Sequence, residues 1–160
     1  MTAVPDAEYA PPHDPDTIPL DVRIGSGWPL TTVTLNGAAG DRWLLDTGAS
    51  GTFLIFDYFA RRHPEALRDE GRGGNLRSVR LQGVGGDFDT QAYQIADLQL
   101  ATIRFRDFTG FRVISNQSYA INRDGLIGTR FLHLFTLGLD YGNSRIYLTP
   151  NAEGHSLGLR

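Results

Sequence analysis

A carboxyl group stands where an apolar segment ends in small residues. The segment LLDTGAS, residues 44–50, carries two leucines, then Asp46, then Thr, Gly, Ala and Ser. A carboxyl group that a strand holds in place can act as a general acid or base. The same residues also favour an ordinary turn, because Asp, Thr, Gly and Ser form local hydrogen bonds with the backbone. The segment alone is therefore compatible with a catalytic carboxylate and with a simple turn.

Two further segments carry glycines at informative places. LQGVGGDF, residues 81–88, has three glycines between strand-like runs. A phosphate-binding loop would have to open a helix, whereas the run after these glycines is strand-like. A hairpin that moves over a cleft fits better, with a flexible hairpin tip as the alternative. In DGLIGTRFL, residues 124–132, Gly128 follows two apolar residues and precedes a predicted helix, where it would allow close backbone packing.

The composition excludes several classes of site. The chain has no cysteine, which excludes disulfides, thiolate metal sites and a cysteine nucleophile. Its formal net charge is -3, so a nucleic-acid-binding surface is not expected. Arg alternates with Phe over residues 104–112, a pattern that would suit base stacking but is also typical of a half-exposed strand. The four histidines match no metal-ligand spacing, so no metal and no other cofactor is expected. Ser50 lacks the Gly-x-Ser-x-Gly turn of an acyl nucleophile.

Short apolar runs separated by turn residues predict an all-β, barrel-like fold with one or two short helices. One helix, or two short ones interrupted at Pro64, is expected over residues 53–70, and another over 128–135. A final hairpin is expected over 137–148, with its turn at Gly142 and Asn143. The remaining strands are predicted at 18–24, 29–35, 42–46, 76–82, 89–95, 96–100, 101–105 and 109–114.

The 160 residues are enough for one domain with a core. Residues 1–19, rich in proline and aspartate, are expected to form a flexible arm or linker, 20–150 the folded domain, and 151–160 a C-terminal tail. No apolar run reaches the length of a membrane span, and the first residues lack the pattern of a secretion signal. The chain as given is expected to be soluble. Its compartment is left open between the cytoplasm and, if a leader or anchor was removed, the periplasm.

The order and spacing of the three segments resemble the retropepsin-like aspartic proteases over residues 20–150. LLDTGAS is similar to their catalytic turn, GVGGDF to the tip of their flap, and GLIGTRFL to the segment that closes the catalytic loop from behind. The helical insert FDYFARRHPEAL, residues 56–67, is closer to the bacterial single-lobe branch. The resemblance implies an all-β closed-barrel lobe with a flap hairpin and one or two short helices.

The resemblance also implies an aspartic endopeptidase in which Asp46, Thr47 and Gly48 form the catalytic turn. Peptide hydrolysis by this route uses water and two carboxyl groups, one ionised and one protonated. The chain contains one Asp-Thr-Gly, so the second carboxyl group is expected from another copy in a homodimer. Thr47 would then hydrogen-bond between the two turns, and Gly48 would let the backbone approach the carboxylates. A mildly acidic pH optimum is expected.

The substrate implied is an extended polypeptide that lies between the flap and the floor of the cleft. Retroviral members place Arg directly after the last glycine of the closing segment, whereas this chain has Thr129 and then Arg130. The alternative function is a non-catalytic peptide-binding lobe, or one half of a two-lobed protease separated from its partner. The residues expected to contact substrate are Ala49, Ser50, Val84, Gly85, Gly86 and Ile127.

Overall fold

The computed structural model describes residues 10–25, 27–51, 53–67, 78–83, 86–114 and 122–159. The helices are α1 (Asp57–Arg62), the 3-10 helix η2 (Pro64–Leu67), α2 (Thr129–Leu132) and α3 (Ala152–Ser156). The strands are β1 (Ile18–Asp21), β2 (Arg23–Gly25), β3 (Trp28–Leu35), β4 (Ala38–Leu45), β5 (Phe53–Ile55), β6 (Ser78–Gly83), β7 (Gly86–Leu100), β8 (Ile103–Val113), β9 (Gly125–Ile127), β10 (Phe135–Asp140) and β11 (Arg145–Pro150).

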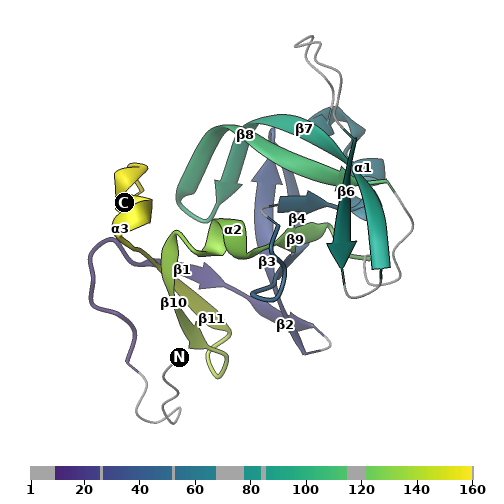
Figure 1. The fold of residues 1–160 in the computed structure, drawn as a ribbon. Helices are drawn as coiled ribbons and strands as arrows, with labels where there is room; N and C mark the ends of the chain where they lie inside the picture. Colours follow the sequence, from purple (N-terminus) through teal and green to yellow (C-terminus); the bar gives the residue numbers. More distant parts are fainter. Residues whose placement is uncertain are drawn as a thin grey trace.

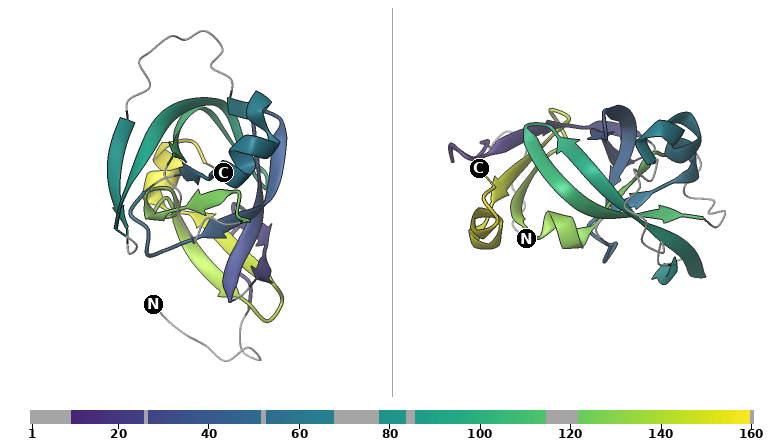
Figure 2. Two further views of the ribbon diagram at one scale, coloured as in Figure 1. Left: turned by 90° about the vertical axis from the view of Figure 1, so that its right-hand side faces the viewer. Right: turned by 90° about the horizontal axis from the view of Figure 1, so that it is seen from above.

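The strands of the larger sheet close into a ring. Their order is β2-β3-β4-β9-β5-β8-β7-β6, and β3 also pairs with β7, so β2 and β6 extend a closed barrel. Most neighbours are antiparallel, whereas β4 pairs with β9 and β5 with β8 in parallel. The strands arch around the interior in Figure 1 and in the left view of Figure 2. The expected all-β barrel is therefore confirmed.

A smaller sheet and two hairpins lie beside the barrel. Strands β1, β11 and β10 form a three-stranded antiparallel sheet in that order. The β10–β11 and β2–β3 hairpins both point to the lower side of the molecule in Figure 1. The turn predicted at Gly142 and Asn143 is confirmed, and Asp140 accepts the backbone N–H of Asn143 at 3.1 Å. β6 and β7 form the expected hairpin, in which Gly83 pairs with Gly86.

The barrel is filled by large apolar side chains. Trp43 of β4 and Phe53 of β5 are fully buried, and their ring centroids lie 5.6 Å apart. Phe131 of α2 packs edge-on against Phe53 at 5.2 Å, and Phe105 of β8 packs against Phe131 at the same distance. Edge-to-face contacts of this kind add to the free energy of burial. The aromatic cluster therefore fixes α2 against the inside of the barrel.

The prediction that a helix begins at residue 53 is wrong. Phe53–Ile55 forms β5, between β9 and β8, and the helix begins only at Asp57. All three residues of β5 are buried, and periodicity cannot distinguish a short buried strand from a buried helix. The interruption at Pro64 is confirmed, since η2 begins there.

Other elements differ from the predicted lengths. The helix expected over residues 128–135 ends at Leu132, because Phe135 already begins β10. The four strands expected between residues 89 and 114 merge into the two long strands β7 and β8, joined by a turn in which Ala101 has a φ of 50°. β4 begins at Ala38, earlier than expected, directly after the Asn36-Gly37 turn.

The C-terminal residues carry a helix that the sequence analysis did not predict. The side chain of Asn151 caps α3 by accepting backbone N–H groups of its first turn. Gly154 lies so close to the Leu134 carbonyl oxygen that an added Cβ would be 2.4 Å away. Leu159 is buried in the core. Residues 1–9 lie outside the described residues, and the division of the chain after residues 19 and 150 stays a prediction.

None of the helices in the described ranges is long and apolar enough to cross a membrane.

Candidate active site

Asp46 directly follows β4, at the start of a tight turn. Its backbone N–H donates to the Ile127 carbonyl oxygen of β9 at 3.0 Å, continuing the pairing of the two strands. Its carboxylate Oδ1 accepts the backbone N–H of Gly48 at 2.8 Å. Its carbonyl oxygen accepts the N–H of Ala49 at 3.3 Å. We call residues 46–50 the aspartate turn; its hydrogen bonds hold the carboxylate of Asp46 at the surface end of a buried strand.

Glycine is favoured at position 48. A Cβ added there would lie 3.2 Å from Oδ1 of Asp46, a tight contact. Without a side chain, the N–H of Gly48 can approach the carboxylate and hold its orientation. Thr47 is exposed, and Asp46 is half-buried, so both are accessible to a molecule placed against the turn.

The start of α2 supports the aspartate turn from behind. The backbone N–H and the hydroxyl of Thr129 both donate to the Ala49 carbonyl oxygen, at 2.7 and 2.9 Å. The N–H of Arg130 donates to the Gly51 carbonyl oxygen at 3.2 Å. A Cβ added to Gly128 would lie 2.2 Å from that oxygen, so the approach requires glycine. Thr129, which stands where retroviral members have Arg, thus supports the turn through hydrogen bonds.

A pocket opens beside the aspartate turn. Its volume is about 240 Å³, and Asp46 and Thr47 form one wall. Three large apolar side chains at its edge are about half exposed: Trp28 at 46%, Leu139 at 45% and Tyr141 at 50%. The Trp28 ring is also covered in part by the guanidinium of Arg123, 5.6 Å from its centroid. The remaining lining comes from Gly27, Pro29, Leu45, Leu132, Leu137 and Ile146.

The structure places the predicted site residues as follows. Residues 46–50 are contiguous in the aspartate turn. The side chain of Ile127 is fully buried in the core, and its carbonyl oxygen binds the N–H of Asp46. Gly86 is the first residue of β7, whereas Val84 and Gly85 lie outside the described residues. Substrate contacts at these positions stay predictions.

The hairpin residues of the pocket were not predicted from the sequence. Trp28 follows the glycines of the first hairpin, and Tyr141 begins the turn between β10 and β11. A large aromatic residue at the tip of a hairpin is a signal that could have drawn attention to them, because turns favour small and polar residues. Leu139 carries no such signal, since exposed and buried leucines look alike in a strand.

Within the described ranges, no group of three or more His, Asp or Glu side chains could hold a metal ion. The chemistry open to these residues is proton transfer by the carboxyl group of Asp46, in a polar turn at the edge of an apolar pocket.

The fold is a closed β-barrel, and an Asp-Thr-Gly turn at the end of one strand is supported from behind by a glycine and a short helix. These features together define a retropepsin-like lobe. A family model of aspartyl proteases matches residues 31–131, from β3 to α2. The chain therefore belongs to the aspartyl protease family, in the retropepsin-like clan, and the resemblance found in the sequence is confirmed. None of the curated proteins compared with the chain matches it.

Proposed function

We propose that the protein is an aspartic endopeptidase that works as a homodimer, in which water is activated between the Asp46 carboxyl groups of two copies. Membership of the aspartyl protease family supports protease activity in general. The observation that carries the finer proposal is the position of Asp46: a fixed carboxylate at the edge of an open, apolar pocket.

The reaction needs two carboxyl groups with different protonation states. One ionised group takes a proton from water, and a protonated one polarises the scissile carbonyl group and later helps to protonate the leaving amine. The Asp-Thr-Gly sequence occurs once in the chain, at Asp46. Two carboxyl groups about 3 Å apart cannot both ionise easily, so the pair shares a proton and titrates as a unit. Thr47 of each copy would hydrogen-bond to the other turn.

An exposed apolar surface beside Asp46 supports association of two copies. Trp28, Leu139 and Tyr141 lie on two hairpins at the edge of the pocket, and about half of each side chain is exposed. Apolar residues gathered in this way mark interaction surfaces. A second copy placed here would cover them and bring its own aspartate turn to the first one.

The proposed substrate is an extended polypeptide. Its backbone would hydrogen-bond as a strand between the β6–β7 hairpin and the aspartate turn, with side chains in alternating pockets. Ala49 and Ser50, which continue the turn after the carboxylate, are the proposed contacts on the floor of the cleft. Val84, Gly85 and Gly86 are the proposed contacts on the hairpin. Ile127 of the closing segment is fully buried, so its proposed part is to hold the backbone of Asp46 through its carbonyl oxygen.

The test compares wild type with Asp46→Asn on a mixed peptide library from about pH 4 to about pH 7, with new chain ends identified by mass spectrometry. Asn keeps an oxygen that can accept the Gly48 N–H, so the turn and the fold persist while proton transfer is lost. Cleavage by wild type alone is expected, and it should rise steeply with protein concentration near the dimer dissociation constant. No cleavage by either protein at high concentration would instead favour a non-catalytic lobe or a half of a two-lobed protease.

A further inference from the structure

A second carboxylate, that of Asp124, lies at the end of β9 away from the aspartate turn, and the proposed reaction does not use it. Asp124 directly precedes β9, and its side chain is fully buried. Its Oδ1 accepts a hydrogen bond from Nη1 of Arg62, in the last turn of α1, at 3.0 Å. Its Oδ2 accepts the backbone N–H of Arg42, in β4, at 3.0 Å. Both carboxylate oxygens are therefore bound, by two different elements.

The backbone of Asp124 joins the same elements. Its N–H donates to the Arg42 carbonyl oxygen at 3.1 Å, and its carbonyl oxygen accepts the N–H of Phe56 at 2.9 Å. Two glycines next to Asp124 have no space for a side chain. A Cβ added to Gly40 would lie 2.6 Å from Oδ2 of Asp124, and one added to Gly125 would lie 2.2 Å from the Trp43 ring. Asp124 thus occupies the junction of β4, β9 and the segment that leads into α1.

A short, fully buried link connects this junction to the catalytic carboxylate. β9 has three residues, all buried, which pair in parallel with the end of β4 from Gly125 to Ile127. The Ile127 carbonyl oxygen then accepts the N–H of Asp46 at 3.0 Å. A displacement of Asp124 would therefore be passed along β9 to the backbone of Asp46, because densely packed elements move as units.

We propose that Asp124 and Arg62 are positioning residues, whose ion pair holds β9 in the place that keeps the Ile127 carbonyl oxygen against the N–H of Asp46. The inference rests on the proposed function, since the group positioned is the proposed catalytic carboxylate. Positional errors of about 1 Å in a catalytic group can lower the rate by about a hundredfold, so a link of this kind affects turnover directly.

Because the Asp124 carboxylate is buried, the position of β9 depends on the positive charge of Arg62. Burial raises the pKa of this carboxyl group; the N–H of Arg42 and the charges of Arg62 and His63 act against the rise, and Asp41 adds to it. Without Arg62, a buried carboxylate would lack its compensating charge at neutral pH, which is strongly unfavourable. Asp124 would then take up a proton or move toward water, and either response alters the start of β9.

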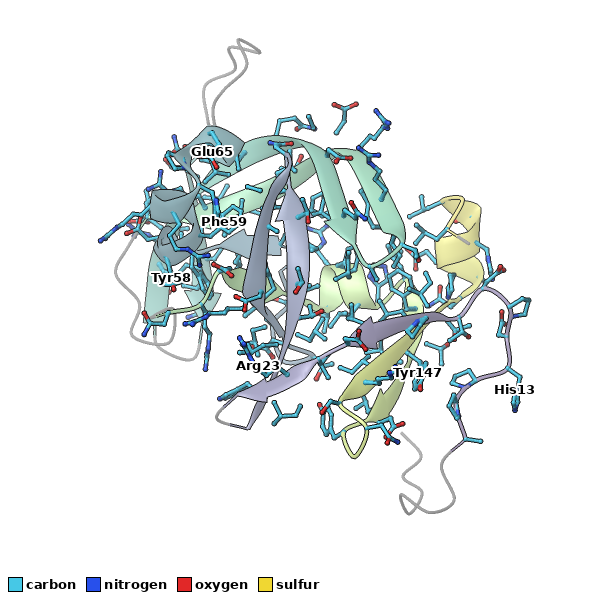
Figure 3. All side chains as sticks on the ribbon, turned by 180° about the vertical axis from the view of Figure 1, so that it is seen from behind. His13, Arg23, Tyr58, Phe59, Glu65 and Tyr147 are labelled. Carbon is cyan, nitrogen blue, oxygen red and sulfur yellow. The ribbon has the colours of Figure 1, made fainter. Side chains whose placement is uncertain are left out.

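Arg62 offers a way to test this without altering the core. Its side chain is 41% exposed, and its guanidinium stacks on Tyr58 of the same helix at 4.8 Å from the ring centroid. Figure 3 shows Tyr58 and Phe59 on α1 at one end of the molecule, with Tyr147 of β11 toward the other end. Arg61 is the matched control, because it is 80% exposed and pairs with Asp57 of its own helix.

The experiment measures kcat and KM of wild type, Arg62→Gln, Arg62→Lys and Arg61→Gln from about pH 4 to about pH 7. We expect Arg62→Gln to lower kcat at neutral pH about tenfold while KM stays within about twofold. The loss should shrink toward acid pH, where Asp124 is protonated and needs no counter-charge. Arg62→Lys should retain most of kcat and Arg61→Gln all of it. Adding Asp124→Asn to Arg62→Gln should restore part of kcat, since the pair is then uncharged.

A second readout does not depend on activity. The backbone amide resonance of Asp46 in the nuclear magnetic resonance spectrum should shift in Arg62→Gln and remain unchanged in Arg61→Gln. If wild type and Asp46→Asn are equally inactive, the proposed function fails, while the amide resonance still tests the link. If wild type cleaves peptides and Arg62→Gln lowers only the melting temperature, with kcat per folded dimer and the Asp46 resonance unchanged, the positioning role is overturned.

Discussion

Gly128 shows how little freedom the residues behind the Asp46 carboxylate have. An added Cβ would lie 2.2 Å from the Gly51 carbonyl oxygen and 2.8 Å from that of Ala49, both backbone atoms that cannot rotate away. We expect Gly128→Ala to push the aspartate turn off α2, lowering the free energy of unfolding by about 2 kcal/mol and reducing peptide cleavage. Urea unfolding and the library assay measure the two effects.

Gly51→Ala is the control for this change, because its added Cβ would meet only Leu54 Cδ2 at 4.0 Å. It lies in the same loop and should leave both quantities nearly unchanged. Equal stability of the two variants would contradict the close packing of Gly128 against the loop.

The sequence indicates Asp46 because its evidence is local: an apolar run, a carboxylate and small residues in one short segment. Asp124 is different. Its sequence neighbours indicate only a junction before a helix, and its ion-pair partner Arg62 lies 62 positions earlier in the chain. A buried carboxylate is recognised by what surrounds it in space, and a single sequence does not contain that information.

At the scale of elements, a hydrogen bond between His133 and Glu153 connects α2 to α3. His133, at the end of α2, binds the Glu153 carboxylate of α3 through Nε2 at 3.1 Å. The hydrogen bond to Glu153 raises the pKa of His133 above its usual value of 6.5, although desolvation acts against the rise. Because the folded-state pKa is raised, protonated His133 stabilises the contact below the unfolded-state value, and this contribution is lost as the pH rises through the folded-state pKa.

We therefore expect α3 to be better protected on the acid side of the His133 titration than on its alkaline side. Amide hydrogen exchange across α3, corrected for the intrinsic pH dependence, measures this, and nuclear magnetic resonance titration gives the His133 pKa. Glu153→Gln should lower that pKa and remove the pH dependence. Glu65→Gln, which removes the carboxylate beside His63, should change neither. A His133 pKa that is the same with and without Glu153 would contradict the pairing.

The elements that were not predicted from the sequence, β5, β9 and α3, are all short. β5 and β9 have three residues each and are buried on every side, so they show no alternation of exposed and buried positions. Helix α3 has five residues, and its signal is the capping side chain of Asn151. The hairpins were predictable because their turns carry their own chemistry, as Asn36 and Gly37 do with positive φ.

At the scale of the whole molecule, the barrel depends on contacts between segments that are distant in the sequence. β3 pairs with β7 to close the ring, and β4 pairs with β9 in parallel. The strand patterns predicted an all-β, barrel-like fold and the family resemblance implied a closed barrel, but neither identified the strands that close it. The pocket is lined by the aspartate turn and by residues of the β2–β3 and β10–β11 hairpins, so the apolar surface beside Asp46 is built from both sheets.

That surface gives a test of the proposed homodimer. Leu139 is 45% exposed at the edge of the pocket. We expect Leu139→Glu to leave the fold intact, since the side chain already faces water in part, but to weaken association by at least about tenfold, because a buried charge would lack a partner in the interface. Sedimentation velocity measures the dimer, and cleavage rate against protein concentration measures its consequence for activity.

Leu157 supplies a matched control for this substitution. It is 64% exposed at the end of α3 and takes no part in the pocket, and α3 lies at the end of the molecule opposite α1 in the right view of Figure 2. Leu157→Glu adds the same charge, so general electrostatic repulsion between copies would affect both variants alike. A loss of dimer and of activity in Leu139→Glu alone would support the face beside Asp46 as the interface. Equal behaviour of both variants, with full activity, would mean that two copies do not meet through this face.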